Sequence, residues 1–431
     1  MLRTSLCTIQ DIGSAYRIDE PPMRKDNNSL RIYTTHLLQL CLRWPQREED
    51  RKEIVRLLSG TIDWQLFQKL ADHHRVLPMV THNVGIASLD ARIEHEGVFA
   101  EVFAGMQKAA QENSYRALRC LTELHKIVRA LGKRDVEICV LKGLPLARTV
   151  YGDLALRSVG DIDLLIDESR ILAADQVLRE LGYRASFDVG EFSTRRRAFY
   201  VAHWKDLTYT SDASGFEVDV HWRCFRNPHM SGSSLGSVAG AETVSFGGFQ
   251  VRTLPRTEGL LYLCMHGLLD GWLYLKSLVD VGVQVRAMSE AELDRLAAAA
   301  ADFGIFAELS ATLAMVRRHL AMDHWSTRLL PEADEAVAHI LRYADVVLEQ
   351  REFLGARESV PISTTLAFEW GLRPDWRYRR ELLLRVLFRV RMWQLIPLPD
   401  ALFWLYPLLS PLEWILFRLR GAPAERAGEG S

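Results

Sequence analysis

The stretch GDIDLLI at residues 160–166 decides the fold, because it alternates two aspartates with apolar residues. Side chains two positions apart in a β-strand point to the same face of the sheet, so Asp161 and Asp163 project together. Two carboxylates this close repel each other unless a cation lies between them, and hard carboxylate oxygens suit Mg²⁺. The sequence thus predicts a strand over 161–167 that carries a magnesium site. The alternative is that the aspartates form only a polar edge at the start of the strand.

A second acidic strand is predicted downstream, in FEVDVHWRCF at residues 216–225. The segment KDLTYTS (205–211) precedes it, and the turn signal DASG (212–215) between the two favours an antiparallel hairpin. Alternation places Asp219 and His221 on one face of this strand. If it lies beside the first strand, Asp219 completes a site of three carboxylates, holds the catalytic metal and helps to deprotonate an acceptor hydroxyl. The alternative is a solvated strand face.

A glycine-containing turn precedes the first acidic strand. The β-branched apolar run VEICVL (136–141) predicts a buried strand, and Lys142-Gly143 follows it directly. Gly143 allows the backbone to approach a phosphate closely, and the next helix offers its N-terminus to that anion. Lys142 adds positive charge there. Arg157, four residues before Asp161, either reaches the triphosphate or pairs with the acidic cluster.

Three stretches together carry a resemblance to a known family: VLKGLPLARTVY (140–151), LRSVGDIDLLI (156–166) and VDVHWR (218–223). They resemble the bacterial uncharacterised nucleotidyltransferase family of the polymerase-β-like superfamily. The resemblance extends more loosely over most of the chain, including residues 71–78 and 266–280. One departure is that Lys142-Gly143 stands where the wider superfamily has Gly-Ser in its phosphate loop.

The resemblance implies an α+β fold, with a nucleotidyltransferase-like mixed β-sheet core, flanking helices, and helical N- and C-terminal regions. It implies a two-metal Mg²⁺ site in which Asp161 and Asp163 bridge the metals and Asp219 holds the acceptor-side metal. The residues expected at the nucleotide are Lys142, Gly143, Arg157, Gly160 and His221, and His221 is alternatively a partner of the metal ligands or a residue of the acceptor site.

The expected activity is Mg²⁺-dependent transfer of a nucleotidyl group from a nucleoside triphosphate such as ATP to an acceptor, with release of pyrophosphate. The acceptor is a small molecule, a protein or an RNA. The alternative is a non-catalytic nucleotide-binding or scaffold protein on the same fold. A further alternative places the protein at the membrane periphery in a polysaccharide or peptide biosynthesis pathway.

Composition limits the partners and the location that the protein can be expected to have. The chain has 431 residues and a formal net charge of −2, so charge gives no support to stable nucleic-acid binding. The six cysteines form no C-x-x-C pair, which favours reduced, mostly buried thiols and a cytoplasmic location. The N-terminus lacks the apolar segment of a signal peptide, and no run reaches the ~20 apolar residues of a spanning helix.

The pattern of the chain predicts five consecutive regions. These are a flexible leader (1–30), a helical N-terminal region (31–132), the nucleotidyltransferase core (133–255), a helical C-terminal region (256–420) and a disordered tail (421–431). A long helix is expected from about 91 to 131.

Three further expectations concern individual segments. RAFYVAHW (197–204) is predicted as a strand, and 257–285 as two helices broken around Gly271. Lys276 and Asp280 are four residues apart, which favours a pair on a helix surface, with contact to nucleotide or acceptor as the alternative.

The C-terminal segment from 376 to 417 combines arginines with large apolar residues. It suggests either peripheral contact with the inner membrane or an amphipathic helix whose arginines extend along a domain surface.

Overall fold

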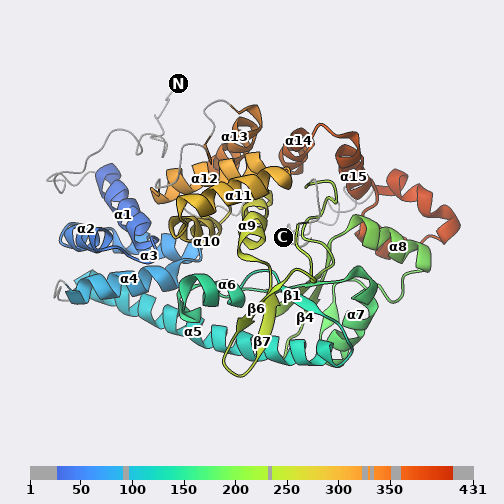
Figure 1. Cartoon of the computed structure of the whole chain (residues 1–431), viewed down its shortest axis with the longest axis horizontal. Coiled ribbons are helices and arrows are strands. Elements are labelled where there is room, and N and C mark those ends of the chain that lie inside the picture. Colours follow the sequence, from blue (N-terminus) through green and yellow to red (C-terminus); the bar gives the residue numbers. More distant parts are fainter. Residues whose placement is uncertain are drawn as a thin grey trace. The chain divides into compact units, whose positions relative to one another are not determined.

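The computed structural model describes residues 27–90, 97–231, 235–322, 329–330, 334–350 and 361–410 (Figure 1). The chain divides into two compact units that are each discontinuous in sequence. The first is drawn from Met1–Leu121, Leu144–Val159 and Leu260–Val360, and the second from Thr122–Gly143, Gly160–Gly259 and Pro361–Ser431. The five linear regions stay a prediction. Most of the predicted leader and all of the predicted tail lie outside the described residues.

The first unit is helical throughout its described residues. Figure 1 shows α1–α4 gathered as one group, and α10, α12 and α13 as another. The described part of the long helix expected from about 91 is α5, which begins at Gly97. The elements are α1 (Asn27–Cys41), α2 (Glu48–Leu58), α3 (Trp64–His73), α4 (Leu77–Asp90), most of α5 (Gly97–Gly132), α6 (Leu144–Leu146), the π-turn η2 (Ala147–Tyr151), η3 (Leu154–Leu156), most of α9 (Arg256–Leu269), α10 (Leu275–Arg286), α11 (Glu290–Asp302), α12 (Phe306–Leu320) and α13 (Glu335–Gln350).

The predicted break around Gly271 is confirmed, because α9 ends and α10 begins on either side of it. Gly271 has a φ of 61°, a left-handed conformation that favours glycine. A Cβ atom at this position would also lie 3.0 Å from Cγ1 of Val347. The residue is therefore fixed as glycine by both its backbone and its neighbour.

The second unit is built on a seven-stranded mixed sheet, which gives the described chain an α+β fold. The strands lie in the order β3-β4-β5-β2-β1-β7-β6. Pairing is parallel between β2 and β5 and between β1 and β7, and antiparallel elsewhere. The strands are β1 (Ile138–Val140), β2 (Ile162–Ile166), β3 (Arg184–Ala185), β4 (Asp206–Thr210), β5 (Glu217–His221), β6 (Glu242–Ser245) and β7 (Gln250–Thr253).

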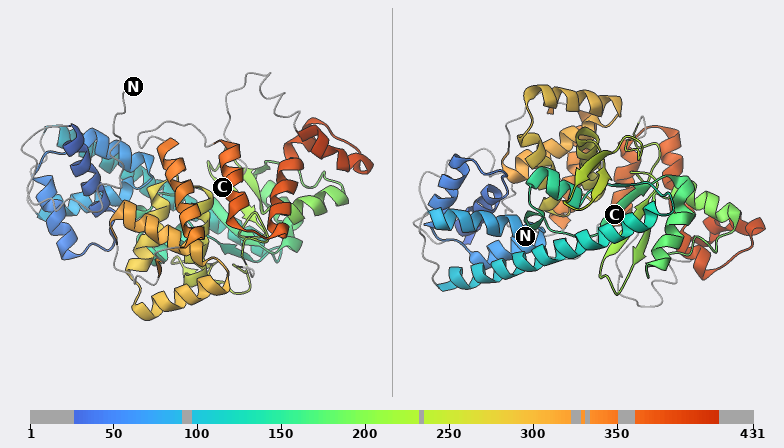
Figure 2. Two further views of the ribbon diagram at one scale, coloured as in Figure 1. Left: turned by 90° about the horizontal axis from the view of Figure 1, so that it is seen from above. Right: turned by 60° about the horizontal axis from the view of Figure 1, so that its bottom comes forward.

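Helices of the second unit flank this sheet. Every residue of β1 and β2 is buried, as expected for central strands covered on both faces. Figure 2 shows α8 beside the C-terminal helices, and α8 contacts α15. The helical elements are η4 (Glu168–Arg170), α7 (Ile171–Glu180), α8 (Thr194–His203), α14 (Ile362–Leu372), α15 (Trp376–Leu387), α16 (Val390–Leu395) and η6 (Asp400–Leu405).

The prediction of a strand at 197–204 was wrong, because these residues form most of α8. Ser193 caps the helix by accepting a hydrogen bond from the backbone N–H of Arg196 at 3.2 Å. Phe199, one of its aromatic residues, packs on another helix, because its ring centroid lies 6.0 Å from that of Trp393 in α16. His203 and Trp204 thus lie at a helix end and not in the sheet.

Two sequence-based expectations about the whole chain can be compared with the described residues. Cys41, Cys120, Cys139, Cys224 and Cys264 are free and buried, as predicted, and Cys7 lies outside the described residues. Among the helices that the structure describes, none has both the length and the apolar character needed to cross a bilayer. Residues 411–417 of the predicted membrane-contacting segment are outside that part of the chain.

Candidate active site

The parallel pairing of β2 with β5 brings the two acidic strands together. Asp163 lies directly opposite Asp219 in this ladder, with Ile162 opposite Val218 on one side of the pair. Paired residues on adjacent strands point to the same face of a sheet. The condition that the two acidic strands lie side by side is therefore met. The predicted antiparallel hairpin of β4 and β5 is confirmed.

Asp163, Asp219 and His221 form a buried group that can hold a metal ion. One ligand atom from each of the three residues lies within 4.8 Å of the other two. Their exposed fractions are 1%, 2% and 0%. Carboxylate oxygens and a neutral imidazole nitrogen are metal ligands, so this donor set fits a divalent cation.

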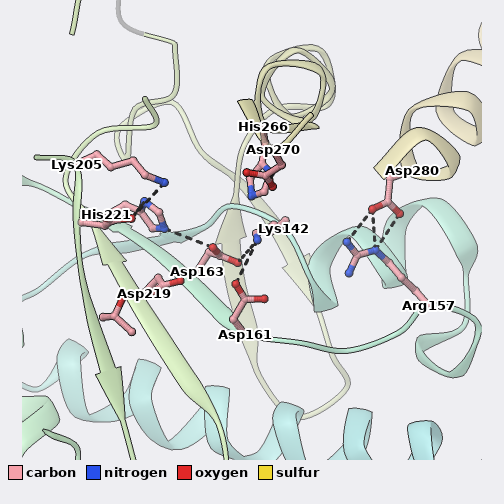
Figure 3. Close-up of polar contacts among 12 residues, drawn as sticks. Lys142, Arg157, Asp161, Asp163, Lys205, Asp219, His221, His266, Asp270 and Asp280 are labelled. Carbon is pink, nitrogen blue, oxygen red and sulfur yellow. Dashed lines mark hydrogen bonds and ion pairs between the residues drawn. The ribbon is translucent and has the colours of Figure 1, made fainter. Parts of the chain in front are cut away.

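Asp161 lies just before β2 and binds Lys142 (Figure 3). The Lys142 Nζ atom is 3.3 Å from Oδ2 of Asp161 and 3.2 Å from Oδ2 of Asp163. The two aspartates therefore do project to the same side, as the alternation predicted. The cation found between them is an ammonium group of the protein itself.

His221 connects Asp163 to a second buried ion pair. Its Nε2 atom lies 3.4 Å from Oδ1 of Asp163, and its Nδ1 atom lies 3.7 Å from Oδ2 of Asp206. Asp206 in turn pairs with the Nζ atom of Lys205 at 3.2 Å. Burial, followed by the charge of Lys205, lowers the pKa of His221 below its usual value. A neutral ring is the form that can donate a lone pair to a metal.

Asp219 lies in an environment that disfavours a bare negative charge. Burial, and then the neighbouring charge of Asp163, raise the pKa of Asp219 to about 8. The Thr208 hydroxyl opposes this by donating a 2.6 Å hydrogen bond to Oδ1 of Asp219. A cation bound here would relieve the repulsion between the Asp163 and Asp219 carboxylates, so these ligands fit a metal ion.

Lys205, Asp206 and Thr208 were not identified from the sequence. All three lie on β4 or directly before it, and the ladder places Asp206 opposite His221 and Thr208 opposite Asp219. The signal was present in the alternation of KDLTYT, because the predicted hairpin register already pairs these positions with the acidic face of β5.

The predicted phosphate-binding turn has the backbone that a glycine permits. Gly143 has a φ of 77°, and its nearest neighbour to a built Cβ is the Asp161 carbonyl oxygen at 3.9 Å. The N–H of Leu141 donates to the Asp163 carbonyl at 3.1 Å, which ties this turn to β2. Gly160, half-buried, has nothing within 4 Å of such a Cβ.

Arg157 lies in the first unit, where it is held by Asp280 (Figure 3). The Nε atom donates to Oδ1 at 2.9 Å and the Nη2 atom to Oδ2 at 2.8 Å. Tyr151 donates a further 2.6 Å hydrogen bond to the same carboxylate. Arg157 therefore pairs with Asp280 within the first unit, and its contact with a phosphate stays a prediction.

The ion pair of Arg157 with Asp280 shows that the predicted surface pair of Lys276 with Asp280 on α10 was wrong. Asp280 is 2% exposed, so it is a buried residue and not half of a surface pair with Lys276. Its charge is balanced by an arginine that lies 123 positions earlier in the chain, which no periodicity along the helix can reveal.

A mixed sheet that presents clustered carboxylates on adjacent parallel strands is consistent with the nucleotidyltransferase class of proteins. Residues 60–321, more than half of the chain, match the family described as "Uncharacterised nucleotidyltransferase". The chain belongs to this family, as its sequence motifs suggested. Comparisons with curated proteins and with solved structures found no match.

Proposed function

We propose that the protein transfers a nucleotidyl group from a nucleoside triphosphate to an acceptor hydroxyl or phosphate, with release of pyrophosphate. The observation that carries the proposal is the pairing of Asp163 with Asp219 on parallel strands, together with the family to which the chain belongs. Mg²⁺ is the proposed ion, because it combines carboxylate ligands with substrate phosphates. A cytoplasmic location is proposed from the buried free thiols of the described chain.

The roles of the residues follow from their chemistry. Asp163 and Asp219, with His221, would hold the metal, which supplies charge neutralisation at the triphosphate when it is bound. Lys142 and Gly143 supply charge and a close backbone approach at the phosphates. Asp161 keeps the Lys142 ammonium group in place.

The experiment is a transfer assay on cell extract with labelled nucleoside triphosphates and Mg²⁺. The wild-type protein is compared with Asp163→Asn and with Asp212→Asn, which removes an exposed carboxylate paired with Arg184. Label should appear on an acceptor with the wild type and Asp212→Asn, and should fall at least about a hundredfold with Asp163→Asn. Equal labelling by all three proteins would defeat the proposal.

A second candidate is nucleotide binding without catalysis, and the Lys142 ion pairs favour it. The ammonium group already neutralises part of the charge that a metal would neutralise in an active site. Under this alternative, nucleoside triphosphates with Mg²⁺ raise the melting temperature but no label is transferred. Transfer by the wild type would exclude it.

We also propose that the protein docks on an anionic bilayer surface through its C-terminal helices. Of the fourteen exposed large apolar side chains in the described residues, nine lie between Ile362 and Leu408, and Trp376 and Trp404 are 63% and 60% exposed. Residues 361–410 carry seven arginines against four carboxylates. Exposed tryptophans beside an excess of positive charge match the chemistry of a bilayer interface with acidic headgroups.

A further inference from the structure

Lys142 occupies the place at which the sequence predicted a bridging metal ion. Its ammonium group lies between the carboxylates of Asp161 and Asp163, 3.3 Å and 3.2 Å from one oxygen of each. The Lys142 side chain is 13% exposed, so solvent screens these ion pairs little. The Lys142 ammonium group is thus already the cation between Asp161 and Asp163.

The remaining position is the group formed by Asp163, Asp219 and His221, whose ligand atoms lie within 4.8 Å of one another. A like-charged neighbour limits what else can enter. The Lys142 ammonium group repels any other cation close to it, and this repulsion is twice as large for a divalent ion as for a monovalent one. A second divalent ion at Asp161 and Asp163 would therefore have to displace the Lys142 ammonium group.

The charges within this cluster can be balanced by one divalent ion. The cluster contains four carboxylates, those of Asp161, Asp163, Asp206 and Asp219, and two ammonium groups, those of Lys142 and Lys205. With all four carboxyl groups ionised, as metal binding requires, they exceed the ammonium groups by two, which equals the charge of one divalent cation. Without Lys142 the excess would be three, and a single divalent ion would leave one buried negative charge unbalanced.

The backbone fixes Lys142 at this place. The residue before it is bonded to β2 through the 3.1 Å hydrogen bond from the N–H of Leu141 to the Asp163 carbonyl, and the residue after it turns the chain with a φ of 77°. The backbone is therefore fixed on both sides of Lys142, and the ion pairs have to offset only the rotamer freedom of its side chain.

We propose that Lys142 serves as the second cation of the site, so that the protein binds one divalent ion where the sequence predicted two. This inference rests on the proposed metal-dependent function. It assigns the ion to Asp163, Asp219 and His221, and it makes Asp161 a positioning residue that holds Lys142 and does not itself contact the metal.

The test counts bound Mn²⁺ ions per chain from the loss of the free Mn²⁺ signal in electron paramagnetic resonance, with Mn²⁺ alone as the probe. The wild type should bind one ion. Lys142→Met, which keeps an unbranched side chain one atom shorter and removes its charge, should bind two. Lys142→Arg, which keeps the charge, should bind one. The matched control is Lys126→Met, which breaks the exposed pair of Lys126 with Glu123 and should leave the count at one.

Circular dichroism and thermal melting establish that each variant is folded before ions are counted. Two ions on the wild type, or one on a folded Lys142→Met protein, would overturn the inference and leave the proposed transferase function standing. No ion on the wild type would overturn the inference and the metal-dependent function together. The transfer assay separates these cases, because it measures labelled product and not bound metal.

Discussion

Asp219 lies opposite Asp163 across two parallel strands, and the Thr208 hydroxyl holds the Asp219 carboxylate from the third strand. The face proposed to bind a metal is thus made by three adjacent strands of one sheet. Strand-mounted ligands are held more rigidly than ligands on loops, which favours a preorganised ion site.

The first prediction is that Asp219→Asn weakens Mn²⁺ binding without lowering the melting temperature. The amide oxygen can still accept the Thr208 hydrogen bond, and the change removes a carboxyl group whose ionisation burial and the Asp163 charge oppose. Affinity should fall at least about tenfold, because one of the charged ligands is lost. Mn²⁺ titration and differential scanning calorimetry measure the two effects. The control is Asp212→Asn on the exposed turn before β5, and tight Mn²⁺ binding by Asp219→Asn would contradict the prediction.

The second prediction concerns the buried pair of Arg157 with Asp280. Their side chains are 6% and 2% exposed, so Arg157→Met leaves a buried carboxylate without its main counter-charge. The free energy of unfolding should fall by ~3–5 kcal/mol, and adding Asp280→Leu should restore much of that loss. Urea denaturation measures both.

The comparison for this second prediction is the exposed pair of Arg184 with Asp212, where the side chains are 70% and 82% exposed. Arg184→Met should change the stability by at most ~1 kcal/mol. Equal effects of Arg157→Met and Arg184→Met would show that burial of the Asp280 carboxylate carries no penalty.

The third prediction is that acid weakens the fold through two buried histidines. Burial lowers the pKa of His74 to about 3, with the charges of His73 and His319 acting in the same direction. Burial, and then Arg318, lower the pKa of His319 to about 4. The unfolded chain binds these protons near pH 6.5, so stability should decline as pH falls from about 6.5 towards 4.

Thermal melting at a series of pH values tests this prediction with His74→Gln. The variant should have a shallower loss of stability over that range, because a glutamine takes up no proton in either state. His229→Gln, at a half-buried histidine of the other unit, is the control. A pH profile of His74→Gln that parallels the wild type would refute the assignment.

The fourth prediction tests membrane docking by co-sedimentation with vesicles. The wild type should bind vesicles that contain phosphatidylserine and not vesicles of phosphatidylcholine alone. The double variant Trp376→Ser/Trp404→Ser should bind at least about fivefold less, because both exposed rings are lost. Leu172→Ser, which removes an exposed apolar side chain on α7, should bind like the wild type. Equal binding to both vesicle types by all proteins would count against an anionic surface.

The sequence predicted the acidic face of the site because that face follows a strict two-residue period. Asp161, Asp163, Asp219 and His221 all come from alternation along two strands, and the hairpin turn that precedes β5 has a strong local signal. The pairing of β2 with β5 was only a condition in that argument, since strand adjacency depends on contacts distant in sequence.

Other parts of the fold needed information that no short pattern contains. Helix α8 was mistaken for a strand because its aromatic residues have high β-propensity, whereas the Ser193 cap and packing on another helix decide its conformation. The hairpin of β6 and β7 was not predicted, although Gly247-Gly248 between two short β-branched runs is a turn signal. The partners of Lys142 and Arg157 follow only from the folded chain.

The crossover between β2 and β5 has a consequence for the proposed metal site. Asp163 and Asp219 belong to strands that pair in parallel, and α7, α8 and β4 lie between them in the chain. A chain in which these strands have not yet paired would offer the proposed ion only part of its ligands. A divalent metal that binds there should therefore stabilise the chain with the completed sheet and not its folding intermediates.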